Sequence, residues 1–296
     1  MIEPEANFSE HWLAARERFD TIARDRHWPL VAAQLSTDQN PISRVLDMGC
    51  GTGSNLRYLR ARLAPLMTPP ISDWRGFDAD QCLLDAARRS TRRSTQSSTQ
   101  SSTHRSPRCD HVQYLRADLA DPTNWPEFTA NDLVSASALI DLVSEPWLTE
   151  LITRCARARA ALLLALTYDG HSRWQPGHPQ DLQILSSFNS DQTRDKGFGV
   201  ALGSAAVTVA HRLLVHAGYR VSTTRSDWLL DARRRNARQI IEPLIANHCQ
   251  IAMRAEPTAA IEFEAWAAER RRQLRGGRLR VRVGHFDLLA ISENFS

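Results

Sequence analysis

One segment constrains the fold more than any other: a short apolar strand that runs directly into a glycine-rich loop and a helix. The strand is predicted over residues 44–48, and Gly49, Gly51 and Gly53 follow it at alternate positions. Glycine lets the backbone turn sharply here and approach a ligand without a Cβ in the way. Apolar residues at helical spacing over 56–63 predict a helix whose first N–H groups point to the same place. The segment therefore predicts a ligand-binding loop, with a plain glycine-rich turn as the alternative.

Strands and helices alternate along most of the remaining chain. Further strands are predicted at residues 74–77, 112–116, 132–137, 161–167, 219–223 and 279–291, and helices at 80–89, 146–157 and 204–217. Alternation at this spacing predicts an α/β fold, with a doubly wound, mostly parallel sheet and helices on both faces. In such folds a ligand lies beyond the carboxyl ends of the strands, where the first strand turns into its helix.

The other segments complete the predicted organisation. Residues 1–40 are predicted to form an N-terminal helical extension, because apolar residues recur at helical spacing over 8–35. Residues 41–296 form the α/β domain. Within it, residues 90–110 are rich in Ser, Thr, Arg and Gln and almost free of apolar side chains, which predicts a flexible surface insertion. Residues 168–203 are predicted to be a loop-rich substrate or lid segment, and residues 233–275 a helical insertion before the last strand.

Composition excludes several classes of protein. With 296 residues, 42% of them hydrophobic and 24% charged, the chain can bury a full core and is neither disordered nor fibrous. The net charge of +4 does not by itself indicate nucleic acid. The five cysteines are dispersed and lack metal-binding spacing, which fits a reducing compartment and predicts no metal site. No apolar run approaches the ~20 residues of a membrane helix, and the acidic N-terminus lacks a signal core, so we expect a cytoplasmic protein outside the membrane.

The loop itself narrows the choice of ligand. A dinucleotide fingerprint needs a third glycine where this chain has Ser54 or Leu56, and a phosphate loop needs a lysine that is absent here. The run Leu-Asp-Met-Gly-Cys-Gly-Thr-Gly at 46–53 resembles the glycine-rich motif of class I S-adenosylmethionine-dependent methyltransferases. The resemblance covers residues 44–219, a little over half of the chain. It implies a Rossmann-like, mostly parallel sheet of seven strands and S-adenosyl-L-methionine as the cofactor.

The resemblance also implies the cofactor-binding residues. Asp78 ends the second strand and matches the carboxylate that binds the ribose hydroxyls, although a helix-cap role, which fits Asp80 better, is the alternative. Asp118 matches the acidic residue that contacts adenine, with Asp121 as the less favoured choice. Asp47 is expected to orient the glycine loop and to reach toward the methionine amino group. The loop, the neighbours of the two carboxylates and the fourth strand supply the remaining implied contacts: Gly49, Cys50, Gly51, Thr52, Gly53, Ala79, Leu119, Ser135 and Ala136.

Three polar residues are candidate catalytic residues on the acceptor side. Asp141 follows the fourth strand in an otherwise apolar stretch and is a base, a substrate anchor or a helix cap. His171 follows the fifth strand and is a candidate general base, although an exposed loop histidine is the commoner case. Lys196 is the only lysine in the chain and lies beside glycines that suit a lid, with chance as the alternative. Trp12 and Arg16 of the N-terminal helix either cover the cofactor or simply pack.

Three functions stay open on these grounds. The favoured one is a methyltransferase that acts on an oxygen or nitrogen of a small-molecule acceptor. The fourth motif lacks both the Asn/Asp-Pro-Pro-Tyr tetrapeptide and the cysteine that nucleic-acid enzymes of the family use. A tRNA or rRNA methyltransferase is the alternative, with arginines at 233–235, 270–272 and 278–282 as phosphate contacts. The third is a non-catalytic protein that only binds the cofactor. A monomer or a homodimer fits each of them.

Overall fold

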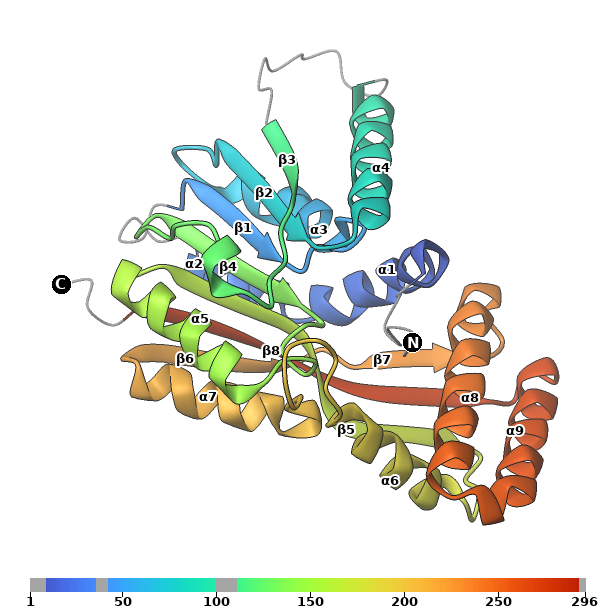
Figure 1. Ribbon diagram of the computed structural model, residues 1–296. Coiled ribbons are helices and arrows are strands. Elements are labelled where there is room, and N and C mark those ends of the chain that lie inside the picture. The colour runs from blue at the N-terminus through green and yellow to red at the C-terminus, as the bar shows by residue number, and fades with distance from the viewer. Residues whose placement is uncertain (1–8, 36–41, 100–110, 293–296) are drawn as a thin grey trace.

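A long sheet, parallel over most of its width, forms the centre of the computed structural model, which describes residues 9–35, 42–99 and 111–292 (Figure 1). Its order is β3-β2-β1-β4-β5-β8-β6, and the short β7 pairs with the first residues of β8. Strands β1 to β5 run parallel, whereas β8 is antiparallel to β5, β6 and β7. The strands are β1 Arg44–Met48, β2 Asp73–Asp78, β3 His111–Arg116, β4 Asp132–Ser137, β5 Ala161–Gln175, β6 Tyr219–Arg225, β7 Trp228–Asp231 and β8 Arg280–Ser292.

Helices cover both faces of the sheet, because successive side chains of each strand point to opposite sides. Val45 and Leu133 belong to the core under α2 and α3, whereas Leu46 and Val134 belong to the core under α5 and α7. The helices are α1 Glu10–Asp25, α2 Trp28–Leu35, α3 Ser54–Leu63, α4 Gln81–Thr99, α5 Glu145–Ala158, α6 Asp181–Gln192, α7 Ala206–His216, α8 Arg235–Ala255 and α9 Ala260–Arg275. No helix in the described ranges combines the length and the apolar character needed to cross a membrane.

The outer parts of β5 and β8 extend past the other strands and carry a core of their own. Trp174 of β5 and Val283 of β8 pack there with Ile241 of α8 and Trp266 of α9. Phe19 of α1 belongs to the same core. Helices α8 and α9 therefore lie at the opposite end of the molecule from β3 and α4, and α1 lies between them (Figure 1).

The sheet differs from the sequence prediction in two ways. The described residues contain eight strands where seven were expected, because β7 adds to the edge of β8. The predicted loop over 168–203 begins as strand and continues as helix α6, since β5 runs on to Gln175. Register shifts against β8 after Leu164 and after Tyr168 let the two strands stay paired over this length. Only alternate side chains of the extension are buried, so its polar composition resembled that of a loop.

The predicted flexible insertion is wrong for residues 90–99, which continue helix α4. The first turns of the helix are anchored by the buried side chains of Leu84 and Ala87. The helix then continues into the polar segment because extending an existing helix is easier than nucleating a new one. The rest of that segment, 100–110, lies outside the described residues, as do 1–8 and 36–41 of the predicted N-terminal extension and 293–296. The helical block predicted over 233–275 is present as α8 and α9.

Candidate active site

Two adjoining cavities lie at the carboxyl ends of the parallel strands, where this type of sheet binds ligands. The first, which we call the loop cleft, has a volume of about 300 Å³ and lies over the glycine loop. The second, which we call the outer cavity, has a volume of about 620 Å³ and lies between α1, α6, α8 and the extension of β5 and β8. Arg16, Ala138, Leu142 and Lys196 line both, so the two spaces meet at these residues.

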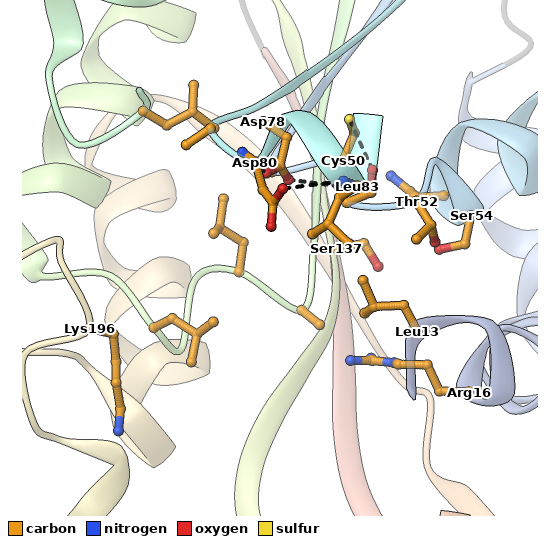
Figure 2. Close-up of a pocket in the computed structure, with 18 of the residues that line it drawn as sticks. Leu13, Arg16, Cys50, Thr52, Ser54, Asp78, Asp80, Leu83, Ser137 and Lys196 are labelled. Carbon is orange, nitrogen blue, oxygen red and sulfur yellow. Dashed lines mark hydrogen bonds between the residues drawn. The ribbon is translucent and has the colours of Figure 1, made fainter. Parts of the chain in front are cut away.

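Asp78 holds the glycine loop to the end of β2. Its Oδ2 accepts a hydrogen bond of 2.8 Å from the Gly51 N–H, and its Oδ1 accepts one of 3.0 Å from the Asp80 N–H (Figure 2). Burial raises the pKa of the Asp78 carboxyl. Gly51 and Gly53 have φ of +51° and +76°, a left-handed backbone that favours glycine, and a Cβ on Gly53 would lie 2.5 Å from the Tyr114 hydroxyl. The loop is therefore fixed both by its backbone and by its packing.

An apolar part of the loop cleft lies beside Asp118. Leu83 and Leu119 line it, the first from α4 and the second from the segment after β3. The Leu119 carbonyl accepts hydrogen bonds from two indoles, that of Trp125 at 2.9 Å and that of Trp147 at 2.6 Å. These two hydrogen bonds hold the backbone at Leu119 and therefore also position the preceding residue, Asp118.

Helix α1 forms a wall of both cavities. Figure 2 shows Leu13 and Arg16 on one side of the loop cleft, across from Lys196. The Arg16 guanidinium pairs with Asp20 at 3.0 Å and lies 4.9 Å from the centre of the Trp228 ring. The Trp228 indole donates to the same carboxylate at 2.9 Å. These contacts hold α1 against β7 where the helix and the strand line the outer cavity.

A buried polar network lies behind the glycine loop. Asp47 does not line either cavity; its Oδ1 accepts a hydrogen bond of 2.6 Å from the Asn55 amide, and burial raises its pKa to about 7. Arg24 of α1 donates to the Asn55 oxygen at 2.7 Å and pairs with Asp287 of β8 at 3.3 Å. Asn55, and not Asp47, reaches the loop cleft. The structure therefore shows Asp47 bound to Asn55 of α3, and it is Asn55 that lines the cleft.

Arg24→Met is expected to lower the free energy of unfolding by about 3 kcal/mol, because it leaves the buried carboxylate of Asp287 without its counter-charge. Urea denaturation measures the change. Arg62→Met is the matched control: its ion pair with Asp25 is more than one-third exposed, and removing it is expected to cost less than about 1 kcal/mol. Equal losses in the two variants would contradict a structural role for the buried network.

Asp141 lies in the outer cavity, beside its junction with the loop cleft. It lines the outer cavity next to Leu142, which lines both. Only 8% of the residue is exposed, and its Oδ1 is buried without a hydrogen-bond partner. Burial raises the pKa of this carboxyl to about 6. A carboxylate that is poorly solvated and has a pKa close to neutral is suited to take a proton from a bound molecule.

The structure brings most of the implied cofactor residues to the loop cleft. Those that line it are Gly49, Cys50, Gly51, Thr52, Asp78, Ala79, Asp118 and Leu119. Gly53 does not line it; this position packs on Tyr114, whose hydroxyl would lie 2.5 Å from a Cβ on Gly53. Ser135 and Ala136 do not line it either, since they lie within β4 between β1 and β5. The last residue of β4 and the two residues after it, 137–139, line the cleft in their place. Asp121 instead begins a short 3₁₀ helix, where it accepts a hydrogen bond from the Thr123 N–H.

The three candidate acceptor-side residues have different positions. Asp141 lines the outer cavity, and Lys196 lines both cavities with its Nζ 3.1 Å from Asp191. His171 lines neither cavity: its side chain is 82% exposed on the solvent side of the β5 extension. The structure therefore places His171 apart from both cavities.

Two histidines of the outer cavity carry no functional signal in the sequence. His248 comes from α8 and His285 from β8, and both are buried. His248 stands between Asn247 and Cys249, and His285 between Gly284 and Phe286, so neither has a local pattern that marks it. Only the fold places them in the same cavity as Asp141. In the described part of the chain, no group of three or more His, Cys, Asp or Glu side chains is arranged to hold a metal ion.

The strand order decides the fold. Strands β3-β2-β1-β4-β5 are parallel, the glycine loop follows β1, and a carboxylate follows β2 at the same edge. The described strands form a Rossmann-like, doubly wound sheet. The fold that the sequence resemblance implied is thus confirmed.

Solved structures resemble the chain at low identity. The cyclopropane synthase MmaA2 from Mycobacterium tuberculosis is 12% identical, with a TM-score of 0.47 over 98% of this chain and 96% of that one. The YcgJ protein from Bacillus subtilis is 12% identical, with a TM-score of 0.46 over 91% and 100%. A geranyl diphosphate C-methyltransferase from Streptomyces coelicolor, solved with S-adenosyl-L-homocysteine, is 13% identical, with a TM-score of 0.42 over 90% and 80%. No protein-family model matches the chain, and no curated protein matches its sequence.

Proposed function

We propose that the protein transfers a methyl group from S-adenosylmethionine to an oxygen or nitrogen of a small-molecule acceptor. The observation that carries this proposal is the junction of the two cavities. A glycine loop with the Asp78 carboxylate lines one, the desolvated Asp141 lines the other, and four residues are common to both walls. A methyl donor in the loop cleft and an acceptor in the outer cavity would meet at that junction.

The residues of the loop cleft fit the cofactor. Each oxygen of Asp78 accepts one backbone hydrogen bond, which leaves lone pairs for the two ribose hydroxyls. Thr52 Oγ1 is buried without a partner on the same wall and is free to bind a polar group of the ligand. Leu83 and Leu119 offer apolar surface beside Asp118 for the adenine ring.

When bound, S-adenosylmethionine supplies an electrophilic methyl group. The chain itself has to position the acceptor, exclude water and accept a proton. Asp141 is our candidate for the proton acceptor because it lies beside the junction with a pKa near 6. Helix α1 and the buried aromatic side chains of the outer cavity keep water away from the reacting atoms.

The arginine clusters support a small-molecule acceptor over RNA. Several of their members are already paired with carboxylates, and Arg270 is fully buried against Asp181. The other pairs are Arg233 with Asp231, Arg271 with Glu242, Arg272 with Glu269, Arg280 with Asp231 and Arg282 with Asp227. Paired arginines contribute little net charge to a phosphate-binding surface. The outer cavity and Asp141 likewise favour an enzyme over a protein that only binds the cofactor.

Calorimetric titration with S-adenosylhomocysteine tests the proposal, with NAD⁺ and ATP as comparison ligands. We expect saturable one-to-one binding of S-adenosylhomocysteine and no heat from the other two. A second step incubates the protein with methyl-labelled S-adenosylmethionine and a metabolite extract, with and without ribonuclease. We expect label in small molecules whether or not ribonuclease is added. Absence of S-adenosylhomocysteine binding, or label found only in RNA, would overturn the proposal.

A further inference from the structure

The outer cavity has a continuous wall of rings. In order along the wall these are Trp12, Trp228, His285, Tyr168, Phe188 and His248. Neighbouring ring centres are between 4.1 and 6.3 Å apart, and the last two rings are stacked with their planes 5° apart. Aromatic walls favour flat ligands, because rings pack edge to face or offset against one another with large contact areas. The body of the acceptor is therefore expected to be a ring system.

The same cavity holds buried polar atoms that lack a hydrogen-bond partner. They are Asp141 Oδ1, Ser172 Oγ, His248 Nε2 and His285 Nδ1, four of the ten such side-chain atoms in the described residues. The exposed fractions of Asp141, His248 and His285 are 8%, 2% and 6%. An unpaired buried polar group costs about 1–3 kcal/mol, so a ligand that pairs with several of them gains affinity.

The hydrogen-bond role of His248 follows from its surroundings. Its Nδ1 lies 2.8 Å from the Leu244 carbonyl oxygen, and since that oxygen can only accept, Nδ1 carries the ring proton. Burial lowers the pKa of His248 to about 4, so the imidazole is neutral at pH 7. Nε2 is then a hydrogen-bond acceptor. An O–H or N–H group of a bound molecule would satisfy it.

We infer that the acceptor is a flat ring compound with two hydroxyl groups, one held by Asp141 and methylated, the other held by His248. The inference rests on the proposed function. The methylated hydroxyl gives its proton to the Asp141 carboxylate while its oxygen bonds to the methyl carbon. The carbon–sulfur bond breaks and its electron pair stays on sulfur. The products are a methyl ether and S-adenosylhomocysteine, and the hydroxyl at His248 is unchanged.

Matched naphthols test this inference on the full chain saturated with S-adenosylhomocysteine. The probes are 2-naphthol and the 2,3-, 2,6- and 2,7-dihydroxynaphthalenes, which share one ring body and differ in the reach of the second hydroxyl. We expect at least one diol to bind on the order of tenfold more tightly than 2-naphthol, as one additional hydrogen bond to a buried acceptor provides. No advantage for any diol, or no binding of any probe, would overturn the inference.

His248→Phe removes the hydrogen-bond acceptor Nε2 but keeps a ring that stacks on Phe188 and contacts Trp174 edge to face. We expect this variant to bind 2-naphthol as the wild type does and to lose the diol advantage to within about twofold. His211→Phe, at an exposed position of α7, is the control and should change neither affinity. A diol advantage that persists in His248→Phe would overturn the role of His248. If this variant folds poorly, the naphthol series on the wild type still tests the inference.

Titrations with S-adenosylhomocysteine alone separate this inference from the proposed function. His248 lines only the outer cavity, so S-adenosylhomocysteine is expected to bind equally well to wild type and His248→Phe. Failure of the cofactor to bind wild type would overturn the proposed function. Normal cofactor binding without diol selectivity would overturn only the inference about the acceptor.

Discussion

Asp78→Ala is expected to lower the affinity for S-adenosylhomocysteine by about a hundredfold. The carboxylate has lone pairs free for two ribose hydroxyls, and hydrogen bonds to a charged group contribute about 1.5–3 kcal/mol each. It also accepts the Gly51 N–H at 2.8 Å, so its removal loosens the loop that surrounds the ligand. Both effects reduce binding. Calorimetric titration of wild type and variant measures the difference.

Asp85→Ala is the matched control for this experiment. Asp85 lies on the same helix, α4, and its side chain is 51% exposed in an ion pair with Arg88. Its loss should leave the affinity unchanged. Asp78→Asn separates the two effects, because an amide oxygen can still accept the Gly51 N–H but no longer offers a charged partner to the ribose. A control variant that binds as weakly as Asp78→Ala would contradict the assignment.

Asp141→Asn is expected to lower kcat on a hydroxyl acceptor by about a thousandfold, within the range observed for general bases. The amide cannot take the proton, whereas the affinity for S-adenosylhomocysteine should stay the same because Asp141 does not line the loop cleft. Methyl transfer from labelled S-adenosylmethionine measures kcat. Unchanged kcat in the variant would show that no carboxylate base is needed at this position.

The pH profile gives an independent readout of the same residue. The base is active as the carboxylate, so kcat/KM of the wild type should fall as the pH drops through about 6, the value to which burial raises the pKa of Asp141. Stability changes in the opposite direction. A folded-state pKa above the unfolded value means that protonated Asp141 favours folding, and this contribution is lost as the pH rises from about 4 to 6. Asp141→Asn should therefore raise Tm at pH 7–8, with a gain on the order of 2 kcal/mol.

The parts of the site that could be predicted from sequence are those with local patterns. The strand, the glycine loop and the carboxylate of Asp78 follow one another at fixed spacing, and parallel strands end at one edge, so their meeting point follows from topology. Asp141 is marked in the sequence as a lone carboxylate in an apolar stretch after the fourth strand, and the structure places it in the outer cavity. No local pattern marks Asn55 as a site residue. Its contact with Asp47 depends on the turn from the glycine loop into α3.

The acceptor side could not be predicted, because it is assembled from distant segments. Trp12, Phe188, His248 and His285 come from α1, α6, α8 and β8, and only the paired extensions of β5 and β8 bring them together. The sequence does not reveal the extension of β5, because its exposed side chains are polar and give it the composition of a loop. His171 was selected for its chemistry, but the alternation of side chains along β5 turns it to solvent.

The division of the hydrophobic core separates the supports of the two cavities. The glycine loop rests on the sheet core that contains Val45 and Leu56, whereas the far wall of the outer cavity rests on a separate core that contains Trp228 and Val283. Substitutions in the second core can reshape the acceptor site while the first keeps its form. On the proposed function, acceptor specificity can thus be altered without disturbing the loop cleft, and directed evolution of new acceptors should start at α6, α8 and the beginning of β8.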